Sequence, residues 1–214
     1  MRRALLLCTL LLGLVACDSS GDTITLRVSD EVTVETTGDA FTYYALVASL
    51  DTTGNVIGTI PGVIPVADAD TSIRWDLAFR GTEILLNSGS SGPGAAVGVF
   101  VDTAFADVDT IAVAGLSYRR DGESTCPSGA RRAICPEPGS PFSPFVLDAA
   151  GALTVDRDRT LILRTGNARG YAKVQFLDYV PADASDPGSG GTLTFQFLVN
   201  PAGRFLTPGL EVTL

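Results

Sequence analysis

The four cysteines are the residues of this chain whose chemistry follows most directly from their positions. Cys17 closes the motif Leu14-Val15-Ala16-Cys17, which comes after the two arginines of residues 1–3 and an apolar run over residues 4–14. The run is too short to span a bilayer, which takes roughly 20 residues. Small residues directly before a cysteine form the lipobox of bacterial lipoproteins, so we predict that the Cys17 thiol carries a diacylglyceryl group.

The lipobox divides the chain into three parts. We predict a lipoprotein signal peptide over residues 1–16, the lipidated cysteine with a short polar tether over residues 17–22, and one folded domain over residues 23–214. Two or more acyl chains, palmitate among them, attach a protein stably to a membrane, whereas one chain does so only marginally. The predicted location is the outer membrane, on its periplasmic or surface face. The alternative is an ordinary secretory peptide with an incidental cysteine.

Cys126 and Cys135 lie in the folded domain, nine residues apart in a loop rich in proline and glycine. An exported chain meets an oxidising compartment, which favours a disulfide between them. Closing so short a loop stabilises a fold by roughly 2–3 kcal/mol. The alternative is a redox or metal site, but two thiols without histidine or a second cysteine pair cannot complete a zinc shell.

Histidine is absent from all 214 residues, which excludes the triads, general bases and zinc sites that depend on imidazole. Methionine occurs only as Met1, which the predicted cleavage removes. The formal net charge is −9, whereas nucleic-acid binding needs clustered Lys and Arg. We therefore expect no nucleic-acid partner and no enzymatic activity.

Paired carboxylates are the remaining groups that could do chemistry. Such a pair can donate oxygens to calcium, but none here has the glycine and distal glutamate of an EF-hand loop. Two carboxylates in one cleft, about 5–10 Å apart, can also hydrolyse a glycosidic bond. We expect most of these acids to be solvated turn residues. The pairs are Asp68/Asp70, Asp107/Asp109 and Asp156/Asp158.

The elements that must position these residues are almost all predicted strands. Apolar and polar residues alternate with the strand period of two over residues 192–199 and 74–79, and the second pattern puts Trp75, Leu77 and Phe79 on one face. No segment has a sustained helical period with caps. The fold class is therefore all-β: a single compact antiparallel domain, sandwich-like with long loops. Further strands are predicted over residues 24–34, 41–50, 83–86, 95–101, 110–118, 153–155, 160–164, 171–180 and 209–214, with an irregular stretch over residues 119–144.

The Gly/Ser loop over residues 87–94 has the composition of a phosphate cradle. A P-loop needs a lysine after its last glycine and a helix whose N-terminus faces the phosphate. Here Gly94 is followed by Ala95-Ala96-Val97, which is a predicted strand. We predict a tight structural crossing between strands.

Several segments together are similar to one known family. Trp75-Asp76-Leu77-Ala78-Phe79 is followed by a strand that ends in Asn87-Ser88-Gly89, then by Ser91-Gly92 and a Gly/Ala-rich strand. The predicted strands over residues 160–165 and 171–179 add a second group. These motifs resemble the HmuY-like haem-binding lipoproteins.

The resemblance covers roughly residues 33–205, including the strand over residues 192–197. It implies a compact, non-enzymatic, all-β lipoprotein of the surface or outer membrane. Such proteins capture haem for iron uptake and pass it to a TonB-dependent receptor. The alternative function is a structural or adhesive surface lipoprotein that keeps the fold without the pocket.

The resemblance implies a haem cofactor held by His or Met side chains, and this chain departs from that pattern. It has no His, and Met1 leaves with the signal peptide, so no family ligand is carried over. Haem iron also accepts a Tyr phenolate or a Cys thiolate. Tyr118 and Tyr171 are the candidate metal ligands, and the alternative for each is a packed β-sheet tyrosine. A porphyrin held in an apolar pocket without iron ligation is a further alternative.

Overall fold

The computed structural model describes residues 23–25, 29–47, 61–109, 116–168, 170–200 and 211–213. The predicted signal peptide, Cys17 and the tether over residues 17–22 lie outside these residues. The described residues contain thirteen strands and two short 3-10 helices, so the predicted all-β class is confirmed. No helix among them is long and apolar enough to cross a membrane.

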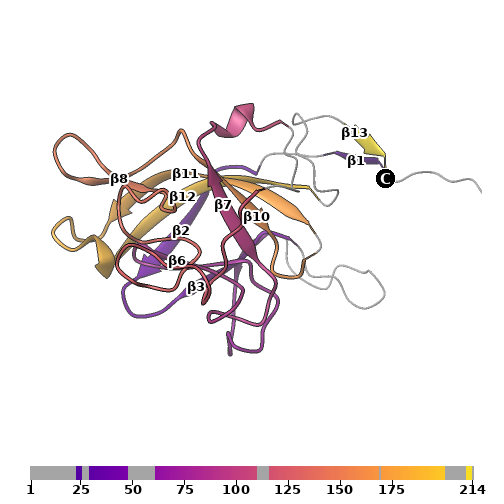
Figure 1. Ribbon diagram of the computed structural model, residues 1–214, viewed down its shortest axis with the longest axis horizontal. Coiled ribbons are helices and arrows are strands. Elements are labelled where there is room, and N and C mark those ends of the chain that lie inside the picture. The colour runs from indigo at the N-terminus through magenta and orange to yellow at the C-terminus, as the bar shows by residue number, and fades with distance from the viewer. Residues whose placement is uncertain are drawn as a thin grey trace, which may run out of the picture.

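The largest sheet has five strands, and all of its neighbours pair antiparallel. Its two longest strands, β11 and β12, form a ribbon that runs the length of the molecule (Figure 1). In sheet order the strands are β2 (Val32–Thr37), β12 (Gly190–Asn200), β11 (Tyr171–Pro181), β10 (Thr160–Arg164) and β7 (Val97–Val101).

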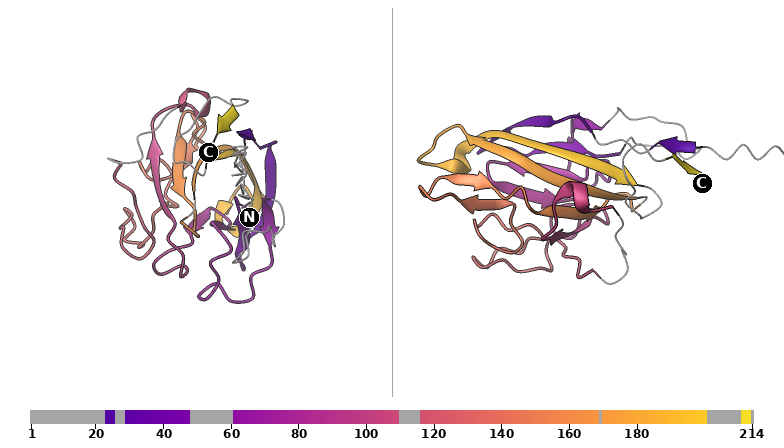
Figure 2. Two further views of the ribbon diagram at one scale, coloured as in Figure 1. Left: turned by 90° about the vertical axis from the view of Figure 1, so that its right-hand side faces the viewer. Right: turned by 90° about the horizontal axis from the view of Figure 1, so that it is seen from above.

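The second sheet has four strands and is also antiparallel. In sheet order they are β4 (Gly62–Ile64), β3 (Thr42–Ala45), β5 (Leu77–Arg80) and β6 (Glu83–Leu86). Two smaller antiparallel pairs join β1 (Thr23–Thr25) to β13 (Glu211–Thr213), and β8 (Phe145–Leu147) to β9 (Leu153–Val155). The β1–β13 pair lies at one end of the molecule, and the β11–β12 hairpin lies at the other (Figure 2).

The main core lies between the two large sheets. The ring of Phe195 in β12 packs edge-on against Tyr44 in β3, with centroids 5.2 Å apart, and against Phe79 in β5 at 5.6 Å. Tilted and edge-on rings are the arrangements that aromatic quadrupoles favour. The two sheets therefore pack face to face, which confirms the sandwich-like prediction.

The five-stranded sheet is also covered on its outer face. Leu161 and Leu163 of β10 point into the main core, whereas Ile162 between them joins a second apolar cluster with Phe105 and Val108. Phe105 belongs to the 3-10 helix η1 (Phe105–Asp107). Because both faces are buried, β10 reads as a continuous apolar run in the sequence.

The predicted face of residues 74–79 is wrong at Trp75. The regular strand begins only at Leu77, and Trp75 packs with Ala78 in a third cluster outside the four-stranded sheet. The backbone bends at Asp76, so the period of two does not extend back to Trp75. The segment 116–118, the described part of another predicted strand, is irregular.

Candidate functional site

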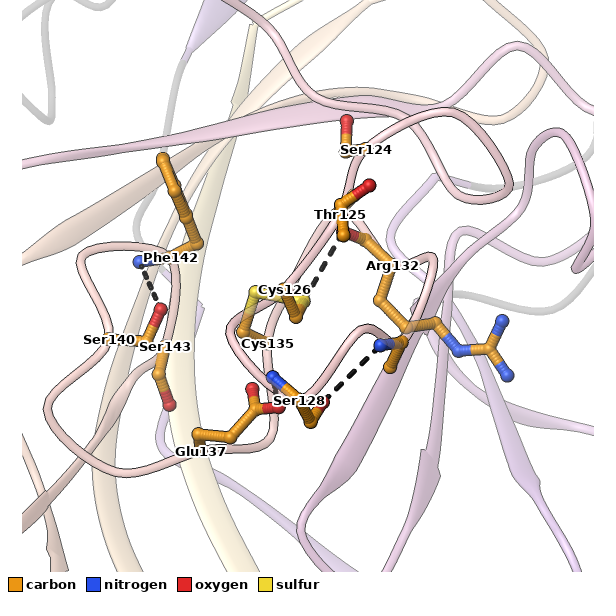
Figure 3. Close-up of a disulfide and its surroundings, with 12 residues drawn as sticks. Ser124, Thr125, Cys126, Ser128, Arg132, Cys135, Glu137, Ser140, Phe142 and Ser143 are labelled. Carbon is orange, nitrogen blue, oxygen red and sulfur yellow. Dashed lines mark hydrogen bonds between the residues drawn. A yellow bond between two sulfur atoms is a disulfide. The ribbon is translucent and has the colours of Figure 1, made fainter.

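The irregular stretch over residues 119–144 is held together by the predicted disulfide, which joins Cys126 to Cys135 (Figure 3). The two Cα atoms are 5.5 Å apart, and both residues are buried. With Glu137 they form the one cluster of three metal-capable side chains among the described residues. Both sulfurs are in the S–S bond and neither is a thiolate, so in this state the cluster offers a metal one carboxylate and no thiolate ligand.

Arg119 fixes the disulfide loop over residues 119–144 from within. Its Nε donates to the carbonyl of Ala133 at 2.9 Å, and its Nη2 donates to the carbonyl of Arg132 at 3.0 Å. The guanidinium also stacks on the ring of Phe142, 3.7 Å from its centroid. These contacts hold the Arg119 side chain within the disulfide loop.

Asp121 fastens the same loop to the sandwich. Its Oδ1 accepts the backbone N–H of Ala133 at 2.7 Å, and its Oδ2 accepts that of Leu86 in β6 at 3.0 Å. Burial raises the pKa of this carboxyl, while the backbone donors act in the opposite direction. The sequence gives no signal for this role, because Leu86 lies 35 residues away.

Asp76, from the Trp-Asp motif, is a buried connector. Its Oδ2 accepts the N–H of Leu46 and its Oδ1 accepts the N–H of Gly166, both at 2.7 Å. Burial raises its pKa to about 6, against the lowering effect of these donors and of the Val47 amide. The residue joins the end of β3, the start of β5 and the turn after β10.

Asn87 connects the Gly/Ser loop over residues 87–94 to the segment before β5. Its Nδ2 donates to the carbonyls of Ser72 and Trp75, at 2.9 and 2.8 Å, and its Oδ1 accepts the N–H of Gly94 at 2.9 Å. A phosphate cradle needs free backbone N–H groups, and this one is already bonded. The predicted structural crossing is confirmed, since residues 88 and 95 also pair across the loop.

The paired carboxylates do not converge on a site. The Oδ1 of Asp68 accepts the N–H of Asp70 at 3.0 Å, and the Oδ1 of Asp156 accepts the N–H of Asp158 at 3.1 Å. These are Asx turns on the surface. The two acids of the third pair, 107 and 109, are exposed. The expectation of turn residues is confirmed.

An apolar groove of about 520 Å³ opens at the end of the molecule that carries the β11–β12 hairpin. Its lining has no ionisable side chain and includes four prolines, which fix the backbone around it. The lining residues are Thr82, Pro136, Pro138, Leu147, Gly151, Ala152, Leu153, Pro181, Ala184, Pro187 and Gly188.

Acidic residues adjoin the groove in sequence. Five acids neighbour a lining residue. Glu83 is paired with Arg80 and Arg132, whereas the other four form no ion pair within the described part of the chain: Glu137, Asp148, Asp183 and Asp186. No Lys or Arg adjoins a lining residue directly. An apolar floor beside unpaired carboxylates disfavours anionic ligands, and haem carries two propionates.

The two candidate tyrosines come together at the other end of the five-stranded sheet. Tyr171 begins β11 and lies opposite Arg164 of β10. The ring of Tyr118 packs against the ring of Tyr171, with centroids 6.3 Å apart. A backbone bridge between Arg119 and Gly98 holds Tyr118 beside β7. The Tyr118 hydroxyl is buried and has no hydrogen-bond partner in the described structure.

The electrostatics of Tyr118 combine burial with a nearby cation. The pKa of its phenol is raised to about 12, chiefly by burial and in addition by Tyr171, while Arg164 acts in the opposite direction. Arg164 is held in place because its Nε and Nη2 both donate to the carbonyl of Ala95, at 3.1 and 2.9 Å. The phenol of Tyr118 is therefore protonated near neutral pH, and its oxygen is buried without a hydrogen bond in the described structure.

Lys173 is the single lysine of the chain, and it is buried on the outer face of the same sheet. Its Nζ donates to the carbonyls of Phe105 and Val108, at 2.7 and 2.8 Å, and lies 4.2 Å from the centroid of the Phe105 ring. Burial lowers its pKa, and Asp109 acts against that shift. The ammonium anchors η1 and is unavailable to a ligand.

Comparison with known proteins identifies a family whose model matches this chain. The family model described as "HmuY protein" matches residues 48–197. Two crystal structures match with 16% sequence identity each. An apo HmuY analogue (TFO) from Tannerella forsythia has a TM-score of 0.45 and covers 84% of this chain and 98% of its own. Apo PinO from Porphyromonas gingivitis has a TM-score of 0.42 and covers 81% and 99%. No curated protein matches the chain.

Proposed function

Because the chain belongs to the HmuY family, we propose that it is a non-enzymatic, lipid-anchored protein of the outer membrane that captures haem or a related ring for iron uptake. Cys17 supplies the anchor in this proposal, and a TonB-dependent receptor is the partner that receives the ring. The observation that carries the proposal is the family match over residues 48–197, which takes in the disulfide loop and most strands of both large sheets, though not β2 and β3.

Tyr118 is the candidate ligand for haem iron, but its hydroxyl is buried in this structure, so haem could reach it only after a local rearrangement. Haem iron takes nitrogen, sulfur or phenolate donors, and the chain lacks His and has no Met after position 1. The phenol of Tyr118 offers an oxygen without a partner, next to the charge of Arg164. When bound, haem would supply the iron that the uptake system delivers to the cell.

A haemin titration tests the capture. The purified full-length protein in detergent receives haemin at micromolar concentration, with a detergent blank and the urea-unfolded protein as controls. We expect a shifted Soret band that saturates at one haemin per chain and is absent from both controls. A spectrum identical to the blank contradicts haem capture.

Intact mass spectrometry tests the anchor separately. We expect the native protein to begin at Cys17 and to carry the mass of two or more acyl chains. In Cys17→Ser the acyl mass should disappear, and the protein should leave the membrane fraction. Recovery of an unmodified native chain in the soluble fraction contradicts the anchor and leaves haem capture standing.

The groove favours a second candidate function, a structural or adhesive surface protein. Much of its lining comes from β8, β9 and the β11–β12 hairpin, and these elements lie at the end of the molecule opposite β1, the first described strand (Figure 2). The apolar floor and its unpaired acidic neighbours suit a basic protein surface that carries an apolar side chain. Leu147→Asp places a carboxylate on the floor and should abolish such adhesion without changing the haemin titration.

A further inference from the structure

We propose that the apolar groove at the β11–β12 hairpin binds an extended peptide segment of a partner protein. In this proposal an apolar side chain of the segment fills the groove, and flanking Lys or Arg side chains meet the acids beside it. The proposal rests on the second candidate function, adhesion to a basic protein surface, and names the site and the chemistry of the bound segment. It is independent of haem capture.

Three segments that are distant in sequence line the groove. Leu147 of β8 and Leu153 of β9 are cross-strand partners, so their side chains lie on the same face of that pair. Pro136 and Pro138 come from the disulfide loop, directly after Cys135 in the case of Pro136. The third part of the lining comes from the β11–β12 hairpin, over residues 181–188.

Contacts among these segments fix the shape of the groove. The Gly139 N–H donates to the carbonyl of Phe145 at 2.8 Å, which ties the proline-rich part of the disulfide loop to β8. The ring of Phe145 packs edge-on against Tyr179 with centroids 5.5 Å apart, and the Tyr179 hydroxyl donates to the carbonyl of Pro187 at 2.6 Å. A site whose walls are already fixed loses little conformational entropy on binding.

The groove exposes apolar surface that a partner can cover. Leu147 is 59% exposed, and among the large apolar side chains that are exposed in the described structure it is the one that lines the groove. The groove volume of about 520 Å³ lies within the range of about 300–1,000 Å³ that is typical of binding pockets. Covering such a patch is favourable, and exposed apolar patches rimmed by polar residues mark interaction sites.

Three carboxylates lie beside this lining. The Oδ1 of Asp148 accepts the N–H of Ala152 at 2.8 Å, and the Oδ1 of Asp186 lies 3.5 Å from the point where a Cβ on Gly188 would stand. Both of these neighbours line the groove, and Asp183 directly precedes another lining residue. All three aspartates are exposed, and none forms an ion pair in the described residues.

The other two acids that adjoin the groove are engaged within the protein. Glu83 pairs with Arg80 and Arg132. Glu137 accepts the N–H of Ser128 at 3.0 Å (Figure 3). The three aspartates therefore supply the free charge beside the groove. A segment with Lys or Arg next to its apolar residue meets complementary charge there, whereas a segment with Asp or Glu is repelled.

Charge also disfavours the other occupants of such a groove. A second copy of this chain has a formal net charge of −9 and brings the same acids. The predicted tether over residues 17–22 holds two aspartates and no Lys or Arg. A small neutral ligand finds Thr82 as the single polar side chain of the lining that could orient it. An apolar centre with a charged surround is instead the arrangement of protein interfaces.

Fluorescence anisotropy with the full-length protein in neutral detergent tests the proposal. The probe is a rhodamine-labelled peptide with capped ends and one leucine between pairs of arginines. We expect saturable binding that weakens at least about threefold when salt is raised from about 50 to about 500 mM, because salt screens exposed charges. Peptides with glutamate in place of arginine, or serine in place of leucine, should bind at least about tenfold more weakly.

A matched pair of variants locates the apolar contact. Leu147→Ser removes the exposed side chain of the groove, whereas Val63→Ser removes one of similar exposure, 57%, from β4 in the other large sheet. Leu147→Ser should weaken binding of the arginine peptide at least about tenfold, and Val63→Ser should leave it unchanged. Both positions are exposed, so thermal midpoints should stay close to the native value, which controls for misfolding.

A second pair of variants locates the charge. Asp183→Asn combined with Asp186→Asn removes two exposed charges beside the groove, and Asp68→Asn combined with Asp70→Asn removes two exposed charges elsewhere. The first should weaken the arginine peptide at least about threefold and reduce its salt dependence, and the second should do neither. Equal effects of the two double variants contradict the role of the groove acids.

The outcomes separate the site from the function on which it rests. Binding of the arginine peptide that Leu147→Ser leaves intact overturns the groove as the site and leaves adhesion standing. Absence of peptide binding, with the native protein still retained on a surface coated with the basic protein lysozyme, overturns peptide docking alone. Absence of both overturns the docking and the adhesion, and the haemin titration is unaffected by either result.

Discussion

Replacing Asp76 by Asn removes one buried charge while keeping the size of the side chain. The native carboxyl is 2% exposed and accepts the N–H groups of Leu46 and Gly166. Its pKa is raised from 3.8 to about 6, chiefly by burial. The substitution should therefore change how the free energy of unfolding depends on pH.

The sign follows from proton binding. Between these two pKa values the folded state holds a proton that the unfolded chain has released, so acid favours the folded state. This contribution is present below the unfolded pKa and is lost as the pH rises through the folded pKa. For a folded pKa of about 6 and an unfolded pKa of 3.8, the loss between pH 4 and pH 7.5 is about 2–3 kcal/mol.

Urea unfolding of the native protein and Asp76→Asn at both pH values measures this loss. The stability of the native protein relative to the variant should fall by about 2–3 kcal/mol from pH 4 to pH 7.5. Asp107→Asn, a change at an exposed acid, controls for the loss of one charge and should differ from the native protein by less than about 0.5 kcal/mol at either pH. A difference that is constant with pH, or that moves the other way, refutes the role of burial at Asp76.

Three further outcomes are expected. Replacing Cys126 and Cys135 together by Ala should lower the free energy of unfolding by roughly 2–3 kcal/mol, and dithiothreitol should then have no additional effect on the variant. Asp121→Ala should cost about 2–4 kcal/mol, because two buried N–H groups lose their acceptor, and amide exchange should accelerate in the disulfide loop before it does in β12. Lys173→Met removes the bonds to the carbonyls of Phe105 in η1 and of Val108 directly after it. Amide exchange around Phe105 should therefore rise while exchange in the four-stranded sheet stays unchanged; equal acceleration in both sheets would contradict the local role of this lysine.

Local patterns predicted the strands well where apolar residues either alternate with polar ones or form a short continuous run. The alternation over residues 192–199 lies within β12, and the predictions for residues 83–86, 153–155 and 160–164 match β6, β9 and β10. Trp75 was assigned to the wrong face because a pattern of apolar residues does not reveal where a strand starts. The three-residue strands β4 and β8 were missed, although β9, of the same length, was predicted.

The candidate site depended on contacts that no local pattern contains. Tyr118 and Tyr171 are 53 residues apart in sequence and meet only because β7, β10 and β11 are neighbours in one sheet. Arg164, whose charge acts on the pKa of Tyr118 against the larger effect of burial, likewise comes from a distant segment, the end of β10. The composition nevertheless limited the candidate iron ligands in advance. The chain has no His, and its single Met is Met1, so few side chains can donate to iron.

The lone lysine has a practical consequence for measuring how this protein opens. A lysine-specific protease has one bond to cut, after Lys173, in the middle of β11. That residue pairs with Ile162 of β10 on one side and Leu198 of β12 on the other. Cleavage therefore requires β11 to leave both neighbours, so fraying of loops and termini produces no cut. The rate of this single cleavage reports the separation of the central strands, and it does so without any label or mutation.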